Sequence, residues 1–148
     1  MNVGTVFRWK DFPDPRDGGV KARWFIYLGD SGYLSQVLIA YPCTTTSQIN
    51  HFQDGGDRRS HDHYLFKKSP KSPFEEDCIL DFDEPPHTPR KSSLENNLSI
   101  EEKGELDEQT LRMIYNRVCR SRTYSKVILM DIHESFNKAG ITGLKKPK

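Results

Sequence analysis

The chain has 148 residues, of which 22 are Lys or Arg and 21 are Asp or Glu, so its formal net charge is +1. This length suits one domain, and a domain of about 150 residues buries roughly 68–70% of the surface that its unfolded chain exposes. The near-neutral balance excludes a general attraction of the whole protein to nucleic acid or membranes, so any such attraction must be local.

The cysteines and the apolar runs indicate where the protein works. Cys43, Cys78 and Cys119 are odd in number and widely spaced, which is typical of a reduced chain and not of a disulfide framework. The N-terminus lacks the apolar core of a signal peptide, and no stretch approaches the ~20 apolar residues of a membrane helix. We therefore expect a soluble, cytoplasmic protein with no membrane partner.

Three short strands are predicted in the first third of the chain. Thr5–Trp9 alternates as a strand does, and Phe12 with the prolines that follow it ends the pattern. Trp24–Leu28 is rich in aromatic and β-branched residues and too short for a helix, and Gln36–Tyr41 follows a turn rich in glycine. The short turn between the last two predicts an antiparallel pair.

Two further strands are predicted beyond a long polar loop at about 45–60. His61–Lys67 carries Tyr64 and Phe66 on one face, and Cys78–Phe82 is a short apolar run between acidic residues. The stretch from Lys67 to Pro73 is basic and broken by proline, so it is predicted to be a connector.

The C-terminal third changes to the helical period. Ser99, followed by two glutamates, is typical of a helix start, and apolar residues recur at helical spacing from Leu106 to Val118 and again from Val127 to Phe136. Lys126–Met130 taken alone also suits a strand. We expect one domain over residues 1–148, with a β core at 4–84, a helical part at 99–140 and a basic tail at 141–148.

The common signatures of nucleotide, zinc-protease and hydrolase sites are absent from the sequence. His61 and His63 would point to the same face of a strand, with Asp62 between them, and this pair is the nearest approach to a metal site. It lacks a second pair at ligand spacing, so we expect solvated histidines, no metal and no cofactor.

Arg23 and the threonines at 44–46 are the strongest functional signal. Arg23 stands at the start of an apolar strand, where a charge needs a partner. One interpretation is a salt bridge to Asp14, Asp17 or the acidic run 75–77. The other is an anion site, for which the planar guanidinium is well shaped and to which the hydroxyl of Thr44 adds a donor.

Four segments in order resemble the MazF/PemK family of toxin endoribonucleases. They are the opening Gly4-x-Val6, Asp11-Phe12-Pro13, Gly19-x-Lys21-x-Arg23; the segment VLIAYPCT that ends on Thr44; PFEEDCILDFDE at 73–84; and GELDEQTLRMIYNRV at 104–118. The resemblance implies a mainly β fold with C-terminal helices (α+β), an SH3-like β-barrel of the MazF/PemK/CcdB type. It also implies a homodimer that cleaves single-stranded RNA without metal and is neutralised by an antitoxin protein.

The resemblance assigns Arg23 as the active-site arginine and Thr44 as its hydroxyl partner. Attack of a ribose 2′-hydroxyl on the adjacent phosphate builds negative charge on the phosphoryl oxygens, and fixed donors stabilise that charge. The reaction also needs a proton acceptor and a donor. The candidates are Asp14, Asp17 and His51, with no matched position to choose among them.

The sequence departs from the family pattern at three places. Trp24 stands where the family usually has proline, residues 48–72 form a longer segment, and the chain after Arg120 is extended. Trp24 is either a base-stacking ring or core filling. A basic rim for RNA, which a solvated charged face explains equally well, is predicted at Lys21, Arg23, Arg58, Arg59, Lys67, Lys68 and Lys71, and Trp24 and Thr45 are further candidates for contact with RNA.

An alternative function follows from the same departures. Trp24 and the enlarged loop would also suit a non-catalytic SH3-like barrel that binds a protein, either a scaffold or a toxin directed at a target such as a topoisomerase.

Overall fold

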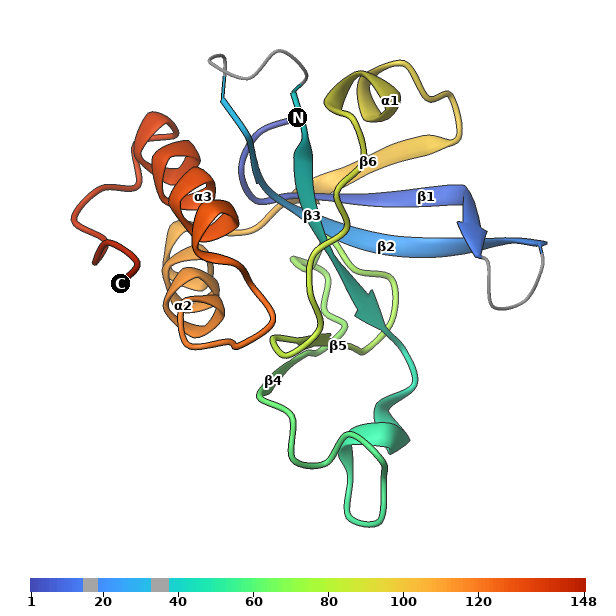
Figure 1. Cartoon of the computed structure of the whole chain (residues 1–148). Coiled ribbons are helices and arrows are strands. Elements are labelled where there is room, and N and C mark those ends of the chain that lie inside the picture. The colour runs from blue at the N-terminus through green and yellow to red at the C-terminus, as the bar shows by residue number, and fades with distance from the viewer. Residues whose placement is uncertain (15–18, 33–37) are drawn as a thin grey trace.

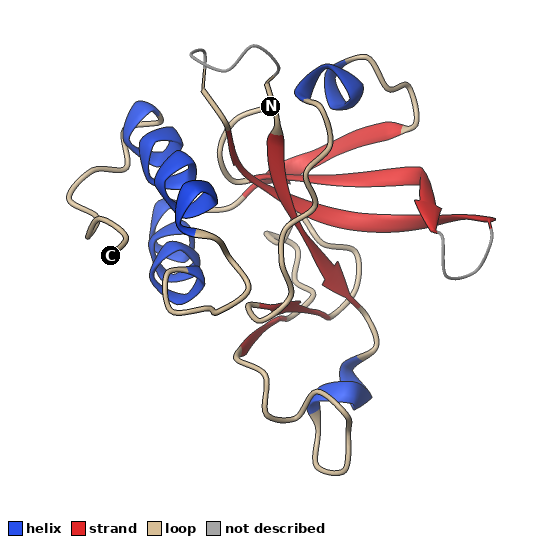
Figure 2. Cartoon of the chain, viewed as in Figure 1, coloured by secondary structure: helices blue, strands red, loops and turns tan. Residues whose placement is uncertain are grey.

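Strands from residues 5 to 105 form one antiparallel sheet, which two C-terminal helices cover. A computed structural model describes residues 1–14, 19–32 and 38–148, except the side chains of Asp14 and Cys43. The sheet order is β4-β5-β3-β2-β1-β6 (Figures 1 and 2). The strands are β1 (Thr5–Asp14), β2 (Gly19–Asp30), β3 (Ala40–Thr46), β4 (His63–Phe66), β5 (Cys78–Asp81) and β6 (Ile100–Glu105).

Four helical segments complete the described chain. A 3-10 turn, η1 (Ile49–Phe52), lies in the loop between β3 and β4, and α1 (Lys91–Glu95) precedes β6. The two longer helices, α2 (Glu108–Val118) and α3 (Lys126–Lys138), lie side by side at one end of the sheet (Figure 1). None of the helices in the described ranges has the length and apolar character that crossing a bilayer requires.

Prolines within β1 and β3 explain why the strand bounds differ from the predicted ones. β1 continues through Pro13 to Asp14, and β3 runs from Ala40 through Pro42, later than the predicted strand, of which residues 36 and 37 lie outside the described chain. Strand β6 pairs with β1 only up to Trp9, and β5 pairs with β3 only beyond Pro42. Each proline therefore has a strand on one side only, where its missing N–H group is tolerated.

The helix start expected at Ser99 is wrong. Residues Ile100–Glu105 form β6, which pairs antiparallel with β1. The carboxylate of Glu101 pairs with Lys10 across the ladder and with Lys103 at 2.9 Å. Cross-strand charge pairing of this kind stabilises a sheet, and it overrides the local resemblance to a helix start.

The next helix instead begins after Asp107, whose carboxylate accepts a hydrogen bond from the Thr110 N–H at 2.7 Å. This N-cap satisfies an N–H group that has no partner within the helix. The predicted helices at 106–118 and 127–136 are confirmed as α2 and α3, and α3 includes Lys126–Met130.

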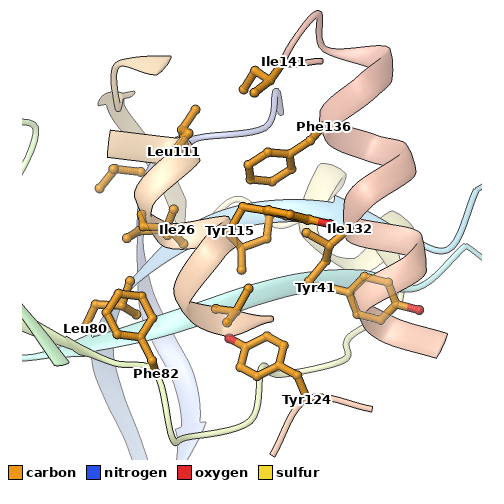
Figure 3. Packing of buried hydrophobic residues seen from close by; sticks show 14 of the residues in the cluster. Ile26, Tyr41, Leu80, Phe82, Leu111, Tyr115, Tyr124, Ile132, Phe136 and Ile141 are labelled. Atoms are coloured by element: carbon orange, nitrogen blue, oxygen red, sulfur yellow. The ribbon is translucent and has the colours of Figure 1, made fainter. Parts of the chain in front are cut away.

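Alternation along the strands buries both faces of the sheet. On the helix side, Ile26 and Leu80 pack with residues of α2 and α3, including Tyr115, Ile132 and Phe136 (Figure 3). The opposite face holds a second cluster of six buried residues: Phe7, Trp9, Phe25, Tyr27, Ala40 and Leu94. The predicted class, mainly β with C-terminal helices, is confirmed.

The basic tail is docked on the helices. Ile141 is buried, and three side chains of α2 and α3 contact main-chain oxygens of the segment. Arg112 donates to Thr142 at 2.8 Å, Tyr115 to Lys145 at 2.5 Å, and the His133 ring lies 3.3 Å from the Leu144 oxygen.

Gly29 marks the closest approach of β2 to α3 and supplies a first prediction. Its φ is +142°, and a Cβ atom built on it would lie 2.5 Å from the Ser135 side chain. Because Gly29→Ala would add both backbone strain and a steric clash, we expect it to lower the free energy of unfolding by about 2–4 kcal/mol, measured by urea denaturation.

The matched control is Gly19→Ala, since a Cβ atom at Gly19 would meet no atom within 4 Å. This variant should stay within about 0.5 kcal/mol of the parent protein. Equal stability of the two variants would contradict the packing of α3 on β2.

Candidate functional site

A cleft of about 900 Å³ opens where β3 separates from β2. The two strands pair as far as Trp24 with Thr45, and β3 then pairs with β5, through Thr45 with Leu80 and Thr46 with Ile79. Residues 19–23 of β2 keep only β1 as a ladder partner among the described strands. The space between the diverging strands is the cleft.

Arg23 and Thr44 both line this cleft. Thr44 pairs with Phe25 in the β2–β3 ladder, and Arg23 is two residues from Phe25, so all three project from one face of the sheet. Trp24, from the opposite face, lines the cleft as well. The cleft therefore reaches both faces at the point where the strands part.

The side chains of Arg23 and Thr44 have different contacts. The Arg23 guanidinium carbon lies 5.7 Å from the centre of the Phe12 ring, within the range of a cation–π contact. Thr44 is buried, and its hydroxyl donates to the main-chain oxygen of Trp24 at 3.2 Å. The threonine oxygen keeps its capacity to accept, and the hydroxyl must rotate before it can donate to a ligand.

Of the acidic residues considered as salt-bridge partners of Arg23, the structure describes the side chains of the run 75–77. Asp17 and the side chain of Asp14, which were also acid/base candidates, lie outside the described residues. Glu75 lines the cleft, and the ion pair that it forms at 3.2 Å is with Lys103.

The third acid/base candidate, His51, does line the cleft. Its Nδ1 lies 2.7 Å from an oxygen of Asp57, which also lines it. This contact with the imidazole lowers the pKa of the Asp57 carboxyl. The long loop thus brings a His–Asp pair to the rim.

His87 is a cleft residue that the sequence reasoning missed. Its ring stands edge-on to Phe12 and Phe25, with centroid distances of 5.2 and 5.4 Å. Burial, and then the positive charge of Arg23, lower the pKa of His87 below its ordinary value. In the sequence it stands among prolines and resembles part of a turn, so no local signal marks it.

The predicted basic rim is divided by the fold. Lys21, Trp24, Thr45 and Arg58 line the cleft, whereas Arg59, Lys67 and Lys68 are exposed outside it. Arg58 faces carboxylates, at 3.5 Å from Asp81 and 3.7 Å from Glu84.

Trp24 packs against the core and also borders the cleft. Its ring lies 5.9 Å from the Phe74 ring, and the Lys103 ammonium lies 5.8 Å from its centre. It is half-buried against the helix-side core. One part of the ring fills the core while the residue also borders the cleft.

Charges in the cleft are balanced in number but separated by origin. The cations Arg8, Lys21 and Arg23 come from β1 and β2, and Arg58 from the loop before β4. The carboxylates Asp57, Glu75, Glu76 and Glu84 come from the loops around β4 and β5. An anion is therefore best stabilised beside the β1–β2 wall.

The His61 ring faces carboxylates, whereas the His63 ring lies 2.9 Å from the main-chain oxygen of His61. The His61 Nδ1 lies 2.8 Å from the buried Asp81, and one ligand atom each from His61, Asp81 and Asp83 lie within 4.8 Å of one another. Asp81 also accepts from the Asp83 N–H at 2.9 Å and faces Arg58. Because a guanidinium already neutralises Asp81, the group is an ion-pair network that holds the end of β5.

Comparison of the chain with protein-family models, with curated proteins and with solved structures finds no match. Evidence for a function must therefore come from the chain's own residues and their arrangement.

The Asp81 network supplies the second prediction. Asp81→Asn removes the charge that His61 and Arg58 face, so we expect a loss of about 2–4 kcal/mol in unfolding free energy, measured by urea denaturation. Asp54→Asn is the control, because Asp54 is exposed in the loop before β4 and should lose less than about 0.5 kcal/mol. An effect at Asp81 no larger than that at Asp54 would contradict the network.

The lowered pKa of His87 predicts a dependence of stability on pH. As pH falls below about 6.5, the unfolded chain binds a proton at this position that the folded chain resists. The stability due to neutral His87 is present above that pH and is lost as pH falls through the folded-state pKa. Denaturation over this pH range should show a flatter profile for His87→Gln than for the parent, and an unchanged slope would refute the assignment.

Proposed function

We propose that this protein is a MazF/PemK-like toxin, a metal-independent endoribonuclease that cleaves single-stranded RNA from an SH3-like barrel. In this proposal it acts in the cytoplasm as a homodimer and is neutralised by an antitoxin protein. The observation that carries the proposal is the common cleft of Arg23 and Thr44, which belong to different strands and are assigned as active-site partners by the resemblance.

The proposed chemistry starts at the phosphate. A phosphodiester bound beside Arg23 would receive two donors of the guanidinium, which hold the phosphoryl oxygens as charge grows on them. The Thr44 hydroxyl, rotated away from the Trp24 oxygen, would add a third donor. Attack by the adjacent 2′-hydroxyl then gives a 2′,3′-cyclic phosphate and a free 5′-hydroxyl.

The walls of the cleft suit a single strand. Lys21 of β2 also lines the cleft, and Arg8, which pairs with Trp24, lines it from the other face of the sheet; both cations would contact phosphates of the strand. Trp24 and Phe74, whose rings are in contact, line the same cleft and would stack on a base. The carboxylates on the opposite wall would exclude phosphates and so fix the path of the strand.

A second candidate function is favoured by one feature. Residues 19–22 of β2 have β1 as their one ladder partner among the described strands, and Lys21 and Ala22 line the cleft. An extended segment of a partner protein could add beside these residues through main-chain hydrogen bonds. In this case the protein is a non-catalytic, protein-binding barrel, and growth arrest on expression with undamaged cellular RNA would favour it over the nuclease.

The direct test incubates the purified protein with a long single-stranded RNA in EDTA. We expect fragments ending in 2′,3′-cyclic phosphate. Arg23→Ala should slow cleavage by about 10²–10³-fold because the charge on the phosphate loses its donors, and Thr44→Val should slow it less.

Arg120→Ala is the matched control, since Arg120 follows α2, where its guanidinium donates to the Asn116 oxygen at 3.3 Å. It should cleave at the parent rate. RNA that stays intact over a range of sequences, or full activity of Arg23→Ala, would refute the proposal.

A further inference from the structure

His87 is a half-buried titratable side chain of the cleft, and the ring contacts that it makes in the described chain are with two phenylalanines. The main-chain N–H of His87 donates to the Pro42 oxygen at 2.9 Å, which fixes the backbone of its loop against β3. The ring then projects between Phe12 and Phe25, edge-on to both. A polar ring held by two apolar rings and open to a cleft is arranged for a ligand.

We infer that His87 is the general base of the proposed cleavage, the group that takes the proton from the attacking 2′-hydroxyl. This inference rests on the proposed endoribonuclease function and adds to it a residue that the resemblance does not assign.

Phe12 places His87 beside the proposed phosphate site. The Phe12 ring contacts the Arg23 guanidinium on the one hand, at 5.7 Å, and the His87 ring on the other, at 5.2 Å. A guanidinium and an imidazole that share one aromatic wall can act on the same nucleotide, the first on the phosphate and the second on the neighbouring ribose. Reacting groups held in this way need no further ordering when the substrate binds.

The electrostatics keep the imidazole ready to accept a proton. Burial and the Arg23 charge lower the pKa of His87, so the free protein carries a neutral ring at neutral pH. A bound phosphate would offset the Arg23 charge and raise that pKa towards the working pH, where a base is most effective. The substrate itself would thus strengthen the base.

The proton balance is complete with water as the only other reactant. A ring nitrogen of His87 takes the 2′-hydroxyl proton while O2′ forms a bond to phosphorus and the bond to the 5′-oxygen breaks. The departing 5′-oxygen takes a proton from water. The imidazolium then returns its proton to the solvent, which restores the neutral ring.

His87 suits this step better than His51 because of their surroundings. The His51 ring nitrogen faces Asp57 at the exposed rim, and the two have side-chain exposures of 40% and 72%. His87 is packed on β1 and β2, the strands that supply the positive wall. The charged and titratable groups that share its cleft in the described chain are Arg8, Lys21, Arg23, His51, Asp57, Arg58, Glu75, Glu76, Cys78 and Glu84.

The test compares His87→Gln and His87→Asn with the parent on a short RNA that contains one mapped cleavage site. We expect kcat to fall by about 10²–10⁴-fold, while the affinity for the same strand with a 2′-deoxynucleotide at that site changes less than about threefold. The control His63→Gln should cleave at the parent rate, because His63 lies outside the cleft and packs on Phe52.

Two readouts separate a base from a structural residue. The acid limb of kcat in the parent should lie at higher pH than that of kcat/KM, and both limbs should follow the ring titration of His87 measured by NMR with and without the deoxy strand. Imidazole added to His87→Ala should restore cleavage by about tenfold or more.

The outcomes distinguish the two proposals. If the parent cleaves, Arg23→Ala does not, and both His87 variants cleave within about tenfold of the parent, His87 is not the base and the nuclease stands. If the variants fail to fold, the parent protein still tests the inference: an acid limb of kcat that does not follow the ring titration of His87 would show that His87 is not the base. A parent protein that leaves RNA intact overturns both.

Discussion

The parting of β3 from β2 is the constraint on which the candidate site depends. After Trp24 pairs with Thr45, β3 continues with β5 as its ladder partner and β2 continues with β1. Each strand thus keeps hydrogen-bonding partners while the sheet opens between them. Had the two strands stayed paired, their side chains would cover a continuous sheet and no cleft would form there.

Packing on both faces holds this divergence in place. The helix-side cluster joins Ile26 of β2 to Leu80 of β5, and the second cluster packs Phe25 against β1. The Arg117 guanidinium bridges α2 to Asp62 and stacks over Phe82, so the β4–β5 side is tied to the helices. A site built on strands supported in this way is held more rigidly than one built on loops.

The charges around the cleft follow the same division of the sheet. Cations on β1 and β2 face carboxylates on the loops around β4 and β5, so a protein of net charge +1 still has a positively charged wall in its cleft. The Arg23 charge also adds to the effect of burial in lowering the pKa of His87. Position within the fold, and not overall composition, therefore decides what the cleft can bind.

Periodicity in the sequence was enough to predict much of the secondary structure. The apolar runs around 24–28, 63–66 and 78–81 form strands, and the helical spacings near residues 111 and 129 form α2 and α3. Arg23 also stood out, because a charge at the start of an apolar strand is unusual at the level of local sequence. The strands, the helices and the unusual position of Arg23 can be predicted because each depends on residues that are close together in the sequence.

Tertiary structure alone decided β6, the position of β3 and the place of His87. Glutamates at 101 and 102 suit a helix start locally, yet pairing with β1 makes them a strand. Pro42 is tolerated in β3 only because β5 joins beyond it. His87 enters the cleft because Phe12, Phe25 and the Pro42 oxygen, all more than forty residues away in the chain, hold it there. Contacts between residues so distant in sequence leave no local pattern from which to predict them.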